Sequence, residues 1–162
     1  MVEPKAGGRG IIAATLAIAI WLSVIPLPVW SRWARPEWVA IVFIYWVIAL
    51  PHRIGVGVGF VTGLILDVVE GSPLGQNAIA LAIIGYLSLS LYQRMRMYAA
   101  WQQSGIVFVL IGLNQLLCHW VQTLTSKVAP TMFFLLPALV SALLWPTVML
   151  LLRRIRRQFA VT

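Results

Sequence analysis

Long apolar runs separated by short basic segments dominate this chain, and they constrain its fold more than any other feature. Apolar residues make up 61% of the 162 residues and charged residues 10%, against about 45–50% and about 25% in a typical soluble domain. A soluble globule of this composition could not cover its surface with polar groups. Disorder is excluded as well, because it accompanies low hydrophobicity. The sequence therefore predicts an integral membrane protein.

The apolar runs number six, and each is followed by a polar or charged break. A hydrocarbon core of about 30 Å needs about 20 apolar residues in a helix, with a working range near 17–25. The runs lack the period-two alternation of barrel strands, so we expect a single domain, an all-α bundle of six transmembrane helices. The expected spans are about residues 11–30, 37–51, 54–70, 76–92, 104–125 and 132–152.

The second and third runs are short for a membrane span. The uncharged stretches 38–50 and 54–66 hold 13 residues each and flank Pro51, His52 and Arg53. Two thin or strongly tilted helices would fit this pattern. A re-entrant hairpin, which enters the membrane and returns on the same side, is the alternative. We favour two spans, and both alternatives place the C-terminus on the same side.

The basic residues indicate the orientation. With the N-terminus in the cytoplasm, six spans place nine of the 12 Lys and Arg residues inside and three outside, namely Arg32, Arg35 and Lys127. This asymmetry follows the positive-inside rule, so we expect both termini in the cytoplasm. The net charge of +8 is not a sign of nucleic-acid binding, because the chain has too few polar residues to build a solvated binding face.

Gly55, Gly59 and Gly63 precede Asp67 at steps of four residues. Residues four apart lie near one helix face, and small residues there let helix backbones approach closely. The pattern predicts a packing seam, used inside the bundle or against a partner's single span. Asp67 is either an interfacial carboxylate hydrated near the membrane surface or a group that bonds a neighbouring helix or a partner. A catalytic or ion-translocating role is less favoured.

The fifth run carries Asn114, Gln115, His119 and Gln122, the last three on one helical face. Polar groups in a membrane should face protein rather than lipid, so we expect inter-helix hydrogen bonds in preference to a ligand site. A metal or cofactor site is not expected, because no acidic or cysteine cluster accompanies the histidines in sequence. Cys118 is expected to be a small buried hydrophobe.

Motifs of catalysis are missing from the sequence. Asp67 has no second aspartate to pair with, Ser72 lacks the G-x-S-x-G context of a serine nucleophile, and no phosphate-binding glycine loop is present. We therefore expect a protein that is not an enzyme.

A basic cluster follows the last span. Anionic lipid at the cytoplasmic surface attracts each such charge by about 1 kcal/mol. We expect this cluster to hold the chain to lipid, in preference to docking a protein. Its members are Arg153, Arg154, Arg156 and Arg157.

Short stretches between residues 35 and 75 form a more specific pattern. They read Arg-Pro-Glu-Trp at 35–38, Tyr-Trp-Val-Ile-Ala-Leu-Pro-His-Arg at 45–53, a glycine-rich run ending in aspartate at 55–67, and Gly-Ser-Pro-Leu-Gly at 71–75. This pattern resembles the rod shape-determining protein MreD family, and the ending at 144–146 and 152–160 is similar to its proteobacterial members. The matching positions, besides the glycine seam, are Arg35, Pro36, Trp38, Pro51, Arg53, Gly71, Leu74 and Gly75.

The resemblance implies a non-enzymatic inner-membrane subunit of the bacterial cell-elongation machinery, without a cofactor. Such a subunit maintains rod shape by scaffolding peptidoglycan synthesis. The implied partners are a bitopic protein of the MreC type, an MreB-type filament and wall synthases, contacted directly or indirectly, together with anionic lipid and no nucleic acid.

The family is also similar in architecture to the six-helix substrate-binding subunits of vitamin transporters, although fold does not fix function. The alternative function is a small-molecule-binding subunit of a membrane importer. It would need a polar cavity between helices, for which Asn114, Gln115 and His119 are the candidate lining.

Overall fold

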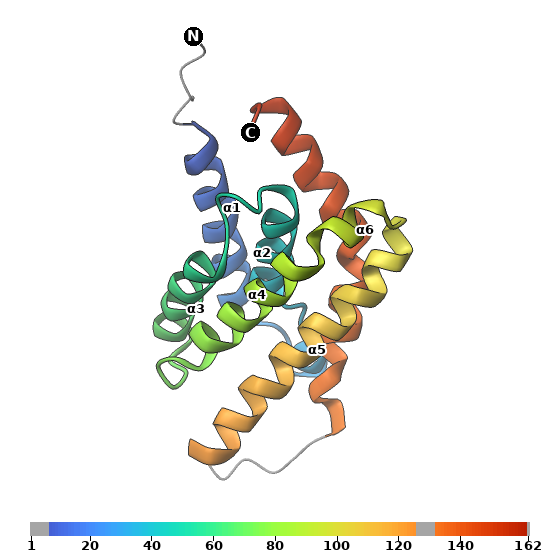
Figure 1. The fold of residues 1–162 in the computed structure, drawn as a ribbon. Helices are drawn as coiled ribbons and strands as arrows, with labels where there is room; N and C mark the ends of the chain where they lie inside the picture. The colour runs from blue at the N-terminus through green and yellow to red at the C-terminus, as the bar shows by residue number, and fades with distance from the viewer. Residues whose placement is uncertain (1–6, 126–131, 162) are drawn as a thin grey trace.

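The structure is a computed structural model that describes residues 7–125 and 132–161. These residues form six α-helices and two 3-10 helices, so the predicted all-α fold is confirmed. Consecutive helices run in alternating directions, and α1 begins at the end of the bundle where α6 ends (Figure 1). The elements are α1 (Gly7–Val24), η1 (Val29–Ala34), α2 (Trp38–Ala49), α3 (Val56–Glu70), α4 (Gln76–Met97), α5 (Ala100–Thr125), η2 (Met132–Leu135) and α6 (Leu136–Gln158).

Helix length divides the elements into two groups. Four segments are long and apolar enough to cross a membrane, namely Gly7–Val24, Gln76–Met97, Ala100–Thr125 and Phe133–Gln158. In contrast, α2 and α3 have 12 and 15 residues, which is about 18 and 23 Å of helix. Their crossing of the membrane stays a prediction.

The ends of the observed helices also differ from the ends of the expected spans. α1 stops at Val24, ahead of Pro26 and Pro28, whose rings and missing N–H groups are unsuited to a helix interior. α6 continues through the basic cluster to Gln158. Lys127, expected on the outer side, lies outside the described residues.

α2 lies at the centre of the bundle. Every residue from Val39 to Ala49 is buried, and α1, α4, α5 and α6 all contact this helix (Figure 1). The fully buried Trp46 donates its indole N–H to the hydroxyl of Thr15 on α1 at 2.9 Å. A helix that is apolar all round suits this enclosed position. Because protein surrounds α2, its length does not need to match the thickness of the lipid.

Side chains and turns from other elements hold both ends of α2. The backbone N–H of Glu37 donates to the hydroxyl of Ser141 on α6 at 2.9 Å. At the other end, Arg96 of α4 donates from Nε to the carbonyl oxygen of Ile48 and from Nη2 to that of Ala49, both at 3.0 Å. A helix end inside a protein leaves backbone groups unpaired unless such partners are supplied. The guanidinium charge also complements the negative end of the helix dipole.

Candidate functional site

Asp67 is the most completely bonded side chain of the predicted site. It is 0% exposed. Its Oδ1 accepts hydrogen bonds from the hydroxyl of Ser72 at 2.8 Å and from the backbone N–H and side-chain amide of Asn77, both at 2.9 Å. Its Oδ2 accepts from the backbone N–H groups of Gly75 at 2.9 Å and Ala78 at 3.4 Å. The carboxylate is bonded to a neighbouring helix and is not hydrated at the surface.

This carboxylate caps the start of α4. The first N–H groups of a helix have no partner within the helix, and the N-terminal end carries partial positive charge. Asp67 supplies both an acceptor and a negative charge there, although it belongs to the preceding helix. The arrangement fixes where α4 begins relative to α3.

Two glycines shape the turn that brings α4 back to Asp67. Gly71 and Gly75 have φ of +68° and +97°, in the left-handed region that favours glycine. Gly71 follows the last residue of α3, a position where such a glycine commonly ends a helix, and the N–H of Ser72 donates to the backbone carbonyl of Asp67 at 3.1 Å. Between the glycines, Leu74 is 73% exposed, so it takes no part in this packing.

Gly59 and Gly63 lie where α3 packs on α4, the most extensive helix pair among the described residues. A Cβ on Gly59 would come within 2.8 Å of the carbonyl oxygen of Leu81. A Cβ on Gly63 would come within 2.6 Å of the Cα of Ala78 and would overlap the carbonyl oxygen of Asn77. Such contacts are too short for any larger side chain, so the close approach of the two backbones depends on these glycines.

Gly55 differs from the other two seam glycines. It precedes α3 as its N-cap, and a Cβ there would meet only Leu89 Cδ1 at an ordinary 3.5 Å. Of the three glycines in the four-residue pattern, Gly59 and Gly63 are therefore required by close packing, and Gly55 is not.

Arg35 holds the end of α1. Its Nη2 donates to the carbonyl oxygens of Leu22 and Ile25 at 3.3 and 3.2 Å. Pro36 lies two residues before the first residue of α2. Trp38 opens α2 and packs against the core. These positions join the end of one helix to the start of the next.

Pro51 and Arg53 lie in the turn between α2 and α3. The backbone N–H groups of Arg53 and Ile54 both donate to the carbonyl oxygen of Leu50 at 3.0 Å, which ends α2 in a tight turn. The side chain of Arg53 is exposed. The positions of the family pattern thus occupy helix ends and turns.

The polar residues of α5 are divided between two environments. Gln115 donates from its side-chain amide to the Glu37 carboxylate at the start of α2, an inter-helix hydrogen bond of the expected kind. Asn114 is buried, and its Oδ1 has no partner among the described residues.

The cavity beside α5 has a volume of about 280 Å³ and is lined by Gln115, Cys118, His119 and Gln122 with Arg32, Trp33, Phe133, Phe134 and Pro137.

His119 and Cys118 take structural positions beside this cavity. The His119 ring stacks on Phe134 with centroids 5.2 Å apart. Cys118 is buried, and its thiol lies 3.4 Å from Oδ1 of Asn77 as a donor. Within residues 7–125 and 132–161, no three His, Cys, Asp or Glu side chains are grouped so that they could hold a metal ion.

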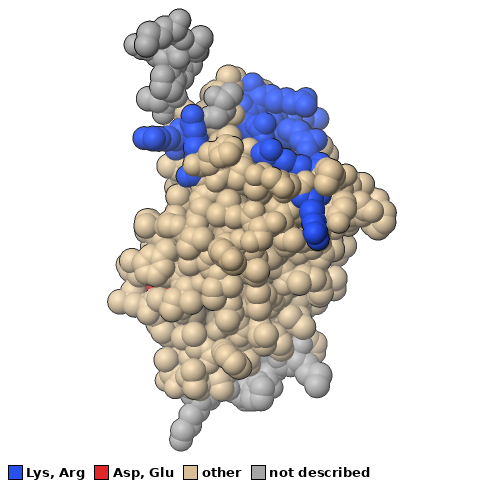
Figure 2. Space-filling model, viewed as in Figure 1, with Lys and Arg blue, Asp and Glu red and all other residues tan. Residues whose placement is uncertain are grey.

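Basic residues gather at the end of the bundle where α1 begins and α6 ends (Figure 2). The basic cluster predicted after the last span lies on α6, and only two of its four arginines line a pocket. Arg153 and Arg156 line this pocket with Arg96 of α4, whereas Arg154 and Arg157 do not line it.

These observations define a multi-pass helical membrane protein whose distinctive polar residues bond helix ends and turns. The family model for the rod shape-determining protein MreD matches residues 7–155. The rod shape-determining protein MreD of Haemophilus influenzae is 35% identical over 151 residues, 91% of either chain. No solved structure matches the chain. The chain belongs to the MreD family of rod shape-determining proteins, as its sequence pattern predicted.

The carboxylate of Asp67 should be needed for the stability of the α3–α4 pair. In Asp67→Asn, an amide nitrogen replaces one acceptor and faces N–H donors, so we expect a loss of about 1–3 kcal/mol in unfolding free energy. Glu70→Gln is the matched control, because Glu70 is an exposed acid one turn further along α3. Thermal unfolding in detergent measures both variants. A loss for Asp67→Asn no larger than that of the control would contradict the capping role.

Gly63 is tightly packed on α4 whereas Gly57 faces open space, and this difference gives a second prediction. Gly63→Ala should push α3 away from α4 and lower the unfolding temperature. Gly57→Ala should leave it unchanged or slightly raised, because a Cβ on Gly57 meets nothing within 4 Å and alanine favours the helix by up to about 1 kcal/mol. Equal effects of the two substitutions, measured by thermal unfolding of the purified protein, would contradict the close packing of this helix pair.

Proposed function

We propose that the protein is a non-enzymatic inner-membrane subunit of the cell-elongation machinery. Its membership of the MreD family supports a role in determining rod shape. The observation that carries the proposal further is the position of the family-pattern residues at helix ends and turns. Arg35, Asp67, Gly71 and Gly75 bond or shape helix ends and turns, which suits a scaffold that must hold a defined surface in the membrane.

The proposed topology has six spans with both termini in the cytoplasm. The alternating directions of the six helices (Figure 1) and the gathering of basic residues at one end (Figure 2) support it. α2 would complete its crossing inside the bundle, whereas α3 would cross at the edge of the bundle with its seam side packed on α4. The short length of α2 is compatible with this arrangement because α2 is enclosed by protein.

The proposed action is to scaffold peptidoglycan synthesis along the side wall with a bitopic protein of the MreC type. MreB-type filaments and wall synthases would be reached directly or through that protein. The outward faces of α1 and α3 offer apolar surface to lipid or to a partner's single span. Their exposed side chains include Ile18, Trp21, Val61, Ile65 and Val68. The basic cluster on α6 would meet anionic lipid at the cytoplasmic surface.

Depletion of the protein in its own host tests this role. Cells should widen and round before growth stops, because side-wall synthesis would lose its organisation, and microscopy of cell width measures this. Plasmid-borne wild-type protein should restore the rods. Rods of normal width with a new nutrient requirement would contradict the proposal and favour the small-molecule importer.

The six-span topology is tested by labelling single cysteines in a Cys118→Ala background. His52→Cys should react with a membrane-impermeant maleimide only after the cells are permeabilised, whereas Leu74→Cys should react in intact spheroplasts. Both positions are exposed, so packing does not block the reagent. If His52→Cys reacts neither in intact nor in permeabilised cells while Leu74→Cys is labelled from outside, the result would favour the re-entrant hairpin.

A further inference from the structure

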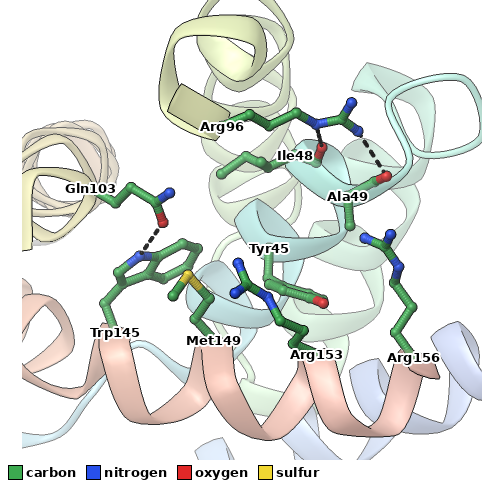
Figure 3. A pocket seen from close by; sticks show the side chains of 9 residues that line it. All are labelled: Tyr45, Ile48, Ala49, Arg96, Gln103, Trp145, Met149, Arg153 and Arg156. Atoms are coloured by element: carbon green, nitrogen blue, oxygen red, sulfur yellow. Dashed lines mark hydrogen bonds between the residues drawn. The ribbon is translucent and has the colours of Figure 1, made fainter. Parts of the chain in front are cut away.

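A small pocket lies where α2, α4, α5 and α6 meet at the basic end of the bundle (Figure 3). Its volume is about 100 Å³, and its polar lining comprises Tyr45, Arg96, Gln103, Arg153 and Arg156. Binding sites for whole drug-sized molecules occupy about 300–1,000 Å³. The pocket is therefore of a size for one small polar group and not for a metabolite.

The pocket concentrates positive charge. Arg153 and Arg156 are three residues apart on one face of α6. Arg96, at the end of α4, lines the same pocket with its guanidinium on the carbonyl oxygens of Ile48 and Ala49 (Figure 3). The three acids of the described residues lie elsewhere. Glu37 is the N-cap of α2, about 18 Å of helix away from Ala49. Asp67 is bonded within the α3–α4 turn, and Glu70 is the last residue of α3 beside that turn. Three guanidinium groups around one cavity repel one another, and an anion between them would offset this repulsion.

Tyr45 adds a buried polar group to the pocket wall. The residue is 5% exposed, and its hydroxyl makes no hydrogen bond of good geometry with a described residue, although the guanidinium of Arg156 lies beside it. Figure 3 shows the tyrosine directed between Arg153 and Arg156. Buried hydroxyls are nearly always hydrogen-bonded, so this donor indicates that the pocket suits an acceptor oxygen.

Other contacts hold the pocket wall in place. Arg96 is fixed by its two bonds to the end of α2 and lies 5.4 Å from the centre of the Tyr92 ring. Gln103 donates to the carbonyl oxygen of Met95 at 2.7 Å and accepts from the indole of Trp145 at 3.2 Å. A wall fixed in this way loses little conformational freedom when a ligand binds.

We propose that this pocket binds a single phosphate group, with Arg153, Arg156 and Tyr45 as donors and Arg96 as a fixed positive wall. Arginine forms paired hydrogen bonds to phosphate oxygens. In the topology proposed above, on which the choice of probe rests, the pocket lies at the depth of cytoplasmic lipid head groups, where basic pockets between helices bind anionic lipids. The phosphate then belongs either to such a lipid or to a soluble phosphate.

Native mass spectrometry of the purified protein, reconstituted with phosphatidylcholine and a minor fraction of phosphatidylglycerol, tests the site. The wild type and Arg157→Gln should retain one phosphatidylglycerol, whereas Arg156→Gln and Tyr45→Phe should each bind it about tenfold more weakly. Arg157→Gln is the matched control, because it removes the same charge from the neighbouring position outside the pocket. Unfolding temperatures of all four proteins show that the variants are folded.

Inorganic phosphate then separates the two sources. If phosphate does not displace the retained phosphatidylglycerol, the site belongs to a lipid head group. If phosphate alone raises the unfolding temperature of the lipid-free wild type but not of Arg156→Gln, the site belongs to a soluble phosphate.

Three results would overturn the proposal. In the first, neither phosphatidylglycerol nor inorganic phosphate binds the wild type. In the second, Arg157→Gln weakens the binding of phosphatidylglycerol as much as Arg156→Gln does. In the third, an acidic peptide binds although both phosphate probes fail. Because the assay uses purified protein, these results would leave the role in cell shape to be judged by the depletion experiment.

Discussion

The enclosure of α2 is the constraint on which the rest of the structure depends. A helix surrounded by protein in a membrane cannot turn to water for the backbone groups at its ends, so other helices must supply their partners. Ser141 on α6 and Arg96 on α4 do so, while Thr15 on α1 bonds the indole of Trp46. The same contacts that satisfy α2 therefore tie the other helices around it.

The α3–α4 hairpin contributes to this arrangement from outside. Asp67 fixes where α4 begins, and the close packing at Gly59 and Gly63 fixes how α4 lies against α3. Arg96, near the other end of α4, then meets the end of α2 and lines the arginine pocket. A turn at one end of the bundle thus helps to position charge at the opposite end.

Much of this could be predicted from the sequence, because the information was local. The apolar runs gave the all-α fold, and the four-residue spacing located the contact at Gly59 and Gly63. The role of Asp67 stayed open, because its acceptor function needs the N–H groups of the next helix, although the glycine-bounded turn 71–75 was a signal for it. The pairing of Arg96 with Arg153 and Arg156 could not be predicted, since it joins segments far apart in the chain.

Photolabelling from within the lipid tests the central position of α2 most directly. The unmodified protein would be reconstituted with a lipid that carries a photoreactive group on its acyl chain, irradiated, and mapped by peptide mass spectrometry. The structure predicts labelling of the exposed faces of α1, α3, α5 and α6 and none within residues 39–49. Labelling of residues 39–49 as strong as that of α1 or α3 would contradict the enclosure of α2.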